Sequence, residues 1–147
     1  MADLDTVVKL NYGLFQEDAG QRDPYTNLNW AKEEGHDYFG PLLEKENYIC
    51  LIAEVEGQPA GYLFGYLKKP YSLRPIHTAE LESMFVEEAY RSQKIGEALA
   101  KGFLDWAKEN GTERVSVSAY AANERAIRFY KSLGFMPKNL VLEVGLD

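Results

Sequence analysis

The sequence predicts one α+β domain that spans residues 1–147. Two β-rich runs, at 48–55 and 60–67, are separated by Glu56-Gly57-Gln58-Pro59, which is a hairpin signal. A third apolar run, at 81–86, predicts a buried strand, and a polar turn connects it to apolar positions that recur at helical spacing from about residue 93. Hairpin strands combined with one strand–helix crossover are typical of the α+β class.

The first 45 residues predict helices. Asp3 and Asp5 are candidates for the N-cap of the first helix. Its apolar face is predicted to consist of Leu4, Val7, Val8, Leu10, Leu14 and Phe15. A second helix is expected from about Leu28, with interruptions at Gly35 and at Gly40-Pro41.

The remaining elements follow the hairpin in order. We expect the central strand from about residue 76 or 77 to Val86, and its helix to end near Asn110. A strand at 115–119, a helix at 123–133 that stops at Gly134, and a last strand at 140–146 complete the chain.

Composition limits the classes of function. The net charge is −7, and residues 1–60 hold 4 Lys/Arg against 12 Asp/Glu. An acidic half of this kind repels nucleic acid and attracts cations, although surface carboxylates also serve solubility alone. No apolar run is long enough to cross a membrane, and no secretory pattern opens the chain, so we expect a cytoplasmic location. The single cysteine, Cys50, lies in a β-rich run and is expected to be a small buried apolar residue.

The turn at 91–96 predicts an anion site. The first N–H groups of a helix project past the end of a strand there, and Arg91 and Lys94 add positive charge. An ordinary strand–helix connection with two solvated cations would show the same pattern. A second segment, Asn123-Glu-Arg-Ala-Ile-Arg-Phe-Tyr-Lys-Ser-Leu-Gly-Phe135, follows the next predicted strand.

Together the two segments resemble the two motifs of the GNAT superfamily, the acyl-CoA-dependent N-acetyltransferases. The first is similar to V-x-x-x-(Y/F)-R-x-x-G-x-G and the second to N-x-x-A-x-x-F-Y-x-x-x-G-F. The resemblance covers about residues 48–146 and implies a mixed, mostly antiparallel sheet with a central splayed strand pair and flanking helices. Only Met1 and Ala2 precede Asp3, so the family's first edge strand is expected to be absent. The unpaired backbone groups of an uncovered sheet edge can pair with a second chain, so a homodimer is one alternative.

The resemblance also implies a site for acetyl-CoA, without a metal. The residues expected at the pyrophosphate are Arg91, Ser92, Gln93, Lys94, Ile95 and Gly96. Lys94 stands where the family usually has glycine. The main-chain groups of Met84 and Val86 would pair with the pantetheine arm, and the N–H near Met84 would polarise the thioester carbonyl. Asn123 resembles the asparagine that contacts the cofactor, and it also occupies a helix N-cap position.

Two catalytic residues are implied. Tyr130 matches the family tyrosine that faces the sulfur and would protonate the leaving thiolate, although a core tyrosine would show the same spacing. Glu82 matches the position of the base in several members, and alternation predicts that Glu80, Glu82 and Met84 share one face. A carboxylate there would either accept the proton or only bind the substrate's ammonium.

We therefore predict an N-acetyltransferase that moves an acetyl group from acetyl-CoA to a primary amine by direct attack. The acidic N-terminal half favours a small cationic acceptor. A protein N-terminus or a lysine side chain is the alternative acceptor. A non-catalytic module that binds CoA or a partner protein is the alternative from another class.

Overall fold

The computed structural model describes residues 3–146. These residues form two compact units, the first reaching Val117 and the second beginning at Ser118. The expected first edge strand would precede Asp3, in a part of the chain that lies outside the described residues. The prediction of a single domain stays a prediction.

The first unit begins with three helices, α1 (Leu4–Glu17), α2 (Ala19–Arg22) and α3 (Trp30–Leu43). The Asp3 side chain caps α1, because its carboxylate accepts the Asp5 backbone N–H at 3.0 Å. Asp5 belongs to the first turn, where a negative charge favours the positive end of the helix dipole.

Helix α3 is continuous, so the prediction that Gly35 and Gly40-Pro41 interrupt it is wrong. Gly35 is buried, and a Cβ there would lie 3.3 Å from the Val8 side chain. The glycine therefore allows α1 and α3 to approach closely. Pro41 lies in the last turn of α3 and lacks the N–H that would donate to the carbonyl four residues earlier, so the helix loses one hydrogen bond there.

A four-stranded sheet forms the centre of the first unit, in the order β1 (Tyr48–Val55), β2 (Gln58–Lys68), β3 (Thr78–Val86) and β4 (Arg114–Val117). The first three strands are antiparallel. The β3–β4 pair is parallel, and helix α4 (Ile95–Glu109) makes the crossover between the two strands. The predicted strand at 115–119 is thus shorter at its end, whereas the hairpin and the central strand are found as expected.

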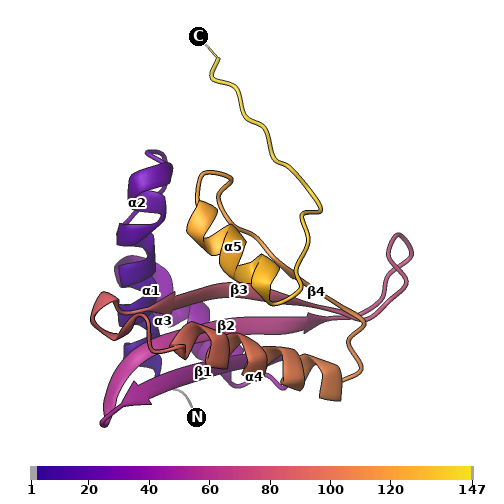
Figure 1. Ribbon diagram of the computed structural model, residues 1–147, viewed down its shortest axis with the longest axis horizontal. Coiled ribbons are helices and arrows are strands. Elements are labelled where there is room, and N and C mark those ends of the chain that lie inside the picture. Colours follow the sequence, from indigo (N-terminus) through magenta and orange to yellow (C-terminus); the bar gives the residue numbers. More distant parts are fainter. Residues whose placement is uncertain (1–2, 147) are drawn as a thin grey trace. The chain divides into compact units, whose positions relative to one another are not determined.

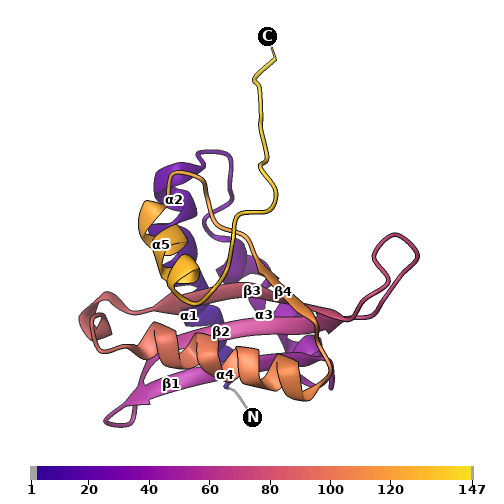
Figure 2. The same ribbon diagram turned by 45° about the vertical axis from the view of Figure 1, so that its right-hand side comes forward.

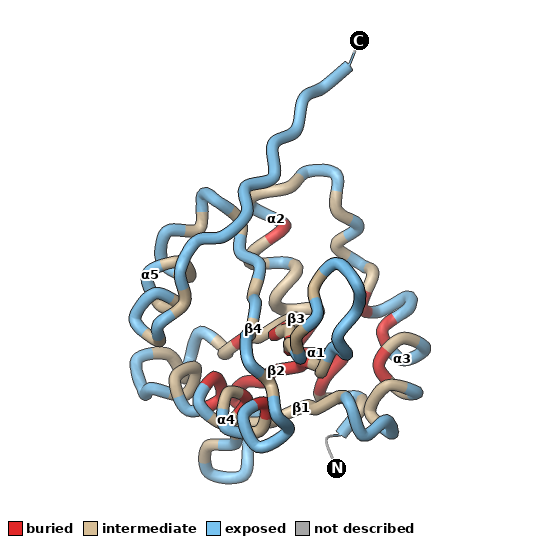
Figure 3. Tube along the Cα trace, turned by 90° about the vertical axis from the view of Figure 1, so that its right-hand side faces the viewer, coloured by how far each residue is buried: buried red, intermediate tan, exposed pale blue. Residues whose placement is uncertain are grey.

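Figures 1 and 2 show α4 on one face of the sheet and α1 with α3 on the other. The buried residues lie on these faces, as the red segments of β2, α1 and α4 show (Figure 3). On the α1/α3 face the core contains Val7, Val8, Phe39, Tyr62 and Phe64. This core holds the two helices against β2 and β3, the strands that carry the candidate site.

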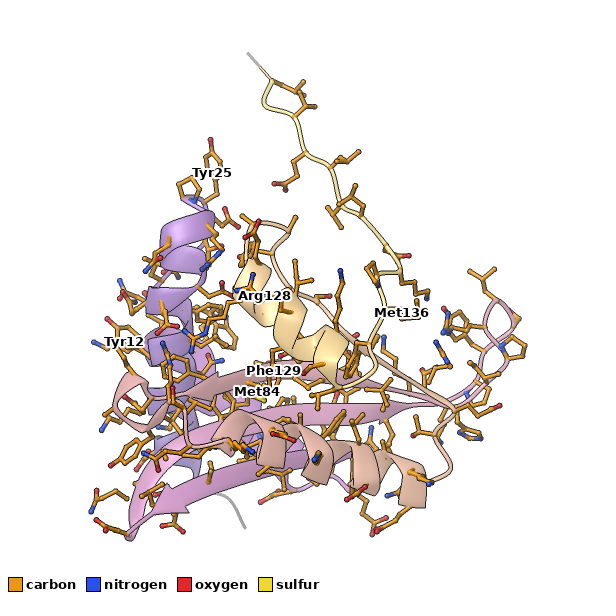
Figure 4. The ribbon with its side chains drawn as sticks, in the orientation of Figure 1. Tyr12, Tyr25, Met84, Arg128, Phe129 and Met136 are labelled. Carbon is orange, nitrogen blue, oxygen red and sulfur yellow. The ribbon has the colours of Figure 1, made fainter. Side chains whose placement is uncertain are left out.

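The second unit contains α5 (Glu124–Ser132). The prediction of a last strand at 140–146 is wrong for this structure, in which these residues are extended and form no strand. Their side chains are exposed, as is Met136, which Figure 4 labels on the same segment. A β-prone run becomes a strand only where another strand pairs with its backbone, and within the second unit no other strand is present among the described residues.

Candidate active site

A bulge in β3 shapes the candidate site. Strand β2 pairs Phe64 with Ser83 and Gly65 with Leu81, so Glu82 is the extra residue of β3. A bulge of this kind re-aims the side chains around it. Glu82 and Ser83 consequently both line one cavity on the α1/α3 side of the sheet, although they are consecutive residues.

The bulge overturns the expectation that Met84 shares a face with Glu82. Ser83 pairs with Phe64, whose ring belongs to the α1/α3 core, and cross-strand partners lie on the same face. Met84 pairs with Leu63 and therefore faces the opposite side of the sheet from Ser83. Figure 4 labels Met84 on β3. Its main-chain groups, which the cofactor prediction concerns, are unaffected by this change of face.

The cavity has a volume of about 490 Å³ and lies between α1, the loop before α3, α3 and β3. Its lining residues are Asn11, Leu14, Phe15, Thr26, Asn27, Trp30, Tyr38, Phe39, Glu82 and Ser83. Aromatic rings make up much of this wall, and Trp30 packs edge-on against both Phe15 and Tyr38. Glu82 is the one charged side chain in the lining that the structure describes. The cavity thus suits an acceptor with an apolar part and a single ammonium group.

The Glu82 carboxylate is held by a tyrosine. The Tyr38 hydroxyl donates to Glu82 Oε1 at 2.7 Å. Burial raises the pKa of the Glu82 carboxyl above its ordinary value, and repulsion from Glu80 acts in the same direction, whereas the hydrogen bond from Tyr38 opposes the shift. Burial and the bond to Glu82 also raise the pKa of Tyr38, so the phenol stays protonated and remains the donor. The arrangement provides a carboxylate with a fixed orientation and an increased affinity for protons.

A buried polar network lies beside the carboxylate. Asn11 Nδ2 donates to the Tyr62 hydroxyl at 2.8 Å, and that hydroxyl donates to Ser83 Oγ at 2.8 Å. Asn11 is only 3% exposed, and its Oδ1 accepts no hydrogen bond from the protein. The network links α1, β2 and β3 at the wall of the cavity.

Three carboxylates of the acidic N-terminal half are placed differently. Glu17 pairs with Arg91, and Asp18 pairs with Arg22 at 3.0 Å. Asp37 is exposed and does not line the cavity. The charge of the N-terminal half is therefore partly neutralised, and Glu82 is the acidic residue that the cavity itself presents.

Strands β3 and β4 separate beside the bulge. Their pairing ends at Leu81 with Val117, whereas β3 continues to Val86. This is the splayed pair that the sequence predicted. On this side of β3 the backbone of Met84 and Val86 has no β4 partner, although the Val86 carbonyl accepts the Arg91 Nε–H at 3.0 Å.

The predicted anion turn follows β3. A short 3₁₀ helix (Glu88–Tyr90) leads into the turn, and Ser92 and Lys94 both adopt positive φ, 70° and 60°. Lys94 precedes the first residue of α4 and makes no side-chain cap, so the first N–H groups of α4, from Ile95 and Gly96 onward, have no partner within the helix. The backbone geometry therefore fits an anion.

The Arg91 side chain points back into the fold and not out of the turn. Its guanidinium contacts Glu17 of α1 and the Val86 carbonyl, and it lies over the Phe85 ring with 5.6 Å between the guanidinium carbon and the ring centroid. The side chain is 19% exposed. These contacts hold the turn against β3 and α1. The predicted contact between Arg91 and the cofactor stays a prediction.

The predicted residues Asn123 and Tyr130 belong to the second unit. Asn123 caps α5, because its Oδ1 accepts the Ala126 N–H at 3.1 Å. The Tyr130 ring packs edge-on against Phe129 and Phe135. The structure brings Glu82, Met84 and Val86 together on one strand, but it describes the second unit by itself, so the predicted roles of Asn123 and Tyr130 stay predictions.

Sequence reasoning missed the partners of Glu82. Tyr38 lies 44 residues from Glu82 in the chain, and no local pattern announces that pair. Asn11 did carry a signal, because it is a polar residue within the predicted apolar face of the first helix. Burial raises the pKa of the Cys50 thiol to about 12, which disfavours the thiolate that a nucleophilic cysteine needs.

The splayed strands, the turn at the start of α4 and the carboxylate-bearing cavity define the fold of an N-acetyltransferase. A Bacillus halodurans protein of known structure has the same fold, with a TM-score of 0.81 and 20% identity over 98% of this chain and 94% of that chain. The sequence matches the acetyltransferase (GNAT) family over residues 11–135. The chain belongs to this family.

Two relatives of different length have similar sequences. An uncharacterized N-acetyltransferase of Methanocaldococcus jannaschii is 28% identical over 95% of this chain, which spans 59% of that protein. A putative ribosomal protein bS18-alanine N-acetyltransferase of Bacillus subtilis is 26% identical over 80% of this chain and 74% of its own length.

Two further findings concern membranes and metal ions. None of the helices between residues 3 and 146 is both long enough and apolar enough to cross a membrane. Within the same residues, no group of three or more His, Cys, Asp or Glu side chains is arranged to hold a metal ion.

Proposed function

We propose that this protein transfers an acetyl group from acetyl-CoA to the primary amine of a small acceptor with a single ammonium group. The observation that carries the proposal is the position of Glu82. Its carboxylate is half-buried, held by Tyr38 and placed in the wall of an aromatic cavity, on the strand that separates from β4. An ammonium group in this cavity meets one carboxylate whose affinity for protons is increased.

The chemistry is direct attack. The amine loses a proton to the Glu82 carboxylate, directly or through water, and its nitrogen then attacks the thioester carbonyl. A C–N bond forms, the nitrogen gives up a second proton, the C–S bond breaks, and the thiolate takes a proton. Because burial raises the pKa of Glu82, the carboxylate is a stronger base than an exposed glutamate.

For the cofactor, we propose contacts that are mostly made by the backbone. The N–H groups at the start of α4 would bind the pyrophosphate, with the turn residues Arg91, Ser92, Gln93, Lys94, Ile95 and Gly96 around it. The main-chain groups of Met84 and Val86 would pair with the pantetheine arm. In this proposal Arg91 mainly holds the turn in place, since Glu17 and the Val86 carbonyl already occupy its guanidinium.

Two residues of the second unit complete the proposal. Tyr130 would protonate the thiolate, because a phenol with an ordinary pKa of about 10 can donate to a thiolate whose conjugate acid has a pKa of about 8.5. Asn123 would contact the cofactor while it caps α5. Both roles rest on the motif that residues 123–135 match.

A protein N-terminus is the second candidate acceptor. The Bacillus subtilis relative, a putative ribosomal protein bS18-alanine N-acetyltransferase, favours it. A lysine side chain and a catalytically inactive CoA-binding module are the remaining alternatives. We also retain the homodimer as a proposal, which light scattering after gel filtration tests.

Release of CoA thiol tests the proposal. The protein is mixed with acetyl-CoA and with two panels, one of small amines and one of peptides with free N-termini or lysine side chains. We expect turnover with small amines, and a loss of kcat of about 10²-fold or more in Glu82→Gln. Turnover with peptides alone would move the assignment to the second candidate. Binding of acetyl-CoA without turnover on either panel would support the inactive module.

A further inference from the structure

One polar atom in the wall of the cavity has no use in the chemistry described so far. Asn11 Oδ1 is buried and accepts no hydrogen bond from the protein, although Asn11 lines the same cavity as Glu82. A buried acceptor without a donor is costly, so native structures rarely keep one without a reason. Replacing Asn11 by an apolar residue of similar size would remove this cost. The helix already places such a residue, Leu14, one turn further along in the lining of the same cavity.

Two hydroxyl groups form a hydrogen-bonded chain with this amide. Asn11 Nδ2 donates to the Tyr62 hydroxyl, which in turn donates to Ser83 Oγ. Tyr62 is fully buried between α1 and the sheet, so its hydroxyl cannot move away from either partner without disturbing the core. Nδ2 thereby has a partner, whereas Oδ1 accepts no hydrogen bond from the protein.

Three other polar residues of the lining already make hydrogen bonds within the protein. The Thr26 hydroxyl donates to Asp23 at 2.8 Å. The Asn27 amide donates to Glu33 at 2.9 Å and accepts the Asn29 N–H at 3.0 Å. Glu82 accepts from Tyr38. Among the described residues, Asn11 Oδ1 is the buried side-chain acceptor without a hydrogen-bond donor.

We propose that Asn11 determines acceptor specificity by accepting a hydrogen bond from a second donor on the substrate, an inference that rests on the proposed function of the same cavity. The acceptor is then a primary amine that also carries an N–H or O–H group. It carries no anionic group, because the described lining contains neither lysine nor arginine. The aromatic wall covers the apolar atoms between the two polar ends.

Both a small amine and a peptide N-terminus can supply this chemistry. In an amino alcohol the second donor is a hydroxyl. In a peptide it is the amide N–H of the second residue. Proline at the second position removes that N–H, so the two sources can be tested with matched pairs.

The experiment compares kcat/KM within pairs of acceptors. The small pair is 3-aminopropan-1-ol and 3-methoxypropylamine, which have the same chain but differ in the hydroxyl donor. The peptide pair is alanylalanine amide and alanylproline amide. For the pair that represents the natural source, we expect the donor-bearing acceptor to be favoured about tenfold by the unsubstituted protein.

Asn11→Leu should abolish this preference, so that the two members of the pair become about equal. A ratio measured in one sample does not depend on how much of the variant is folded. Asn11→Asp, which keeps the size and an acceptor oxygen, should retain the preference. Glu82→Gln is the matched control, because it should lower kcat for both members and leave their ratio unchanged.

Two results would overturn the role of Asn11: equal kcat/KM within both pairs for the unsubstituted protein, or a preference that survives in Asn11→Leu. Calorimetric binding of the same pairs in the presence of CoA tests Asn11 even without turnover. Discrimination in binding without any acetyl transfer would contradict the proposed function and support the inference. Acetyl transfer without discrimination would contradict the inference alone.

Discussion

Replacing Lys94 by glycine should stabilise the protein by about 0.5–1 kcal/mol, because the backbone at this position is left-handed. Lys94 has φ 60° and ψ 24°, a conformation that costs a residue with a Cβ about 1–2 kcal/mol. Glycine avoids that cost, but its greater freedom in the unfolded chain takes back about 0.5–1 kcal/mol. The same conformation explains why glycine is usual at this position of the motif.

Urea unfolding followed by circular dichroism measures the effect. For a chain of this size, a change of 1 kcal/mol corresponds to about 2–4 °C in Tm, so thermal unfolding gives a second measurement. Lys94→Ala is the matched control, because it removes the same exposed charge and keeps the Cβ. Equal stabilities of Lys94→Gly and Lys94→Ala would refute the reasoning, since the gain could not then come from the backbone conformation.

The same pair of variants separates two roles of Lys94 in binding the cofactor. If the lysine contributes a charge contact to the pyrophosphate, both variants should lose affinity for acetyl-CoA to the same extent. If its Cβ keeps the phosphates away from the turn, only Lys94→Gly should gain affinity. Calorimetric titration with acetyl-CoA distinguishes these outcomes.

Three other substitutions test the remaining contacts. Burial raises the pKa of Glu82, so the stability that its protonated form contributes is fully present below the ordinary pKa and is lost as the pH rises through the raised value. The difference in unfolding free energy between Glu82→Gln and the unsubstituted protein should therefore be more favourable to the variant at pH 7 than at pH 4. An equal difference at both pH values would contradict this. Arg91→Glu breaks the contacts with Glu17 and the Val86 carbonyl and should lower the free energy of urea unfolding by about 1–3 kcal/mol. It should also weaken acetyl-CoA binding. Unchanged affinity in the folded variant would remove Arg91 from the cofactor site. Tyr130→Phe keeps the ring contacts with Phe129 and Phe135 and should lower kcat far more than stability or cofactor affinity; full activity would return Tyr130 to a core role.

The order of the elements was predictable from local patterns. Apolar spacing located α1 and α4, β-rich runs located β1 and β2, and the Asp3 cap followed from residue type alone. These features depend on residues within one or two turns of each other, so periodicity reports them directly. The pattern failed at α3, where burial of Gly35 against Val8 overrides the tendency of glycine to interrupt a helix.

The pattern also failed at residues 140–146, for a different reason. The run has the residue types of a strand, but a strand is stable only when its backbone groups pair with another strand. Pairing is decided by segments elsewhere in the chain. Composition of the run itself does not contain that information.

For the site, the sequence by itself determined the turn at the start of α4 and the presence of Glu82 on the central strand. The tertiary structure decided what these groups do. The bulge at Glu82 arises from pairing with β2, and it turns Ser83 toward the cavity and Met84 to the opposite face. Tyr38 reaches Glu82 across 44 residues, and Glu17 reaches Arg91 across 74. Such contacts depend on how helices pack onto a sheet, and residue spacing along the chain does not record that packing. Only the folded structure could therefore show which carboxylates remain available to a substrate.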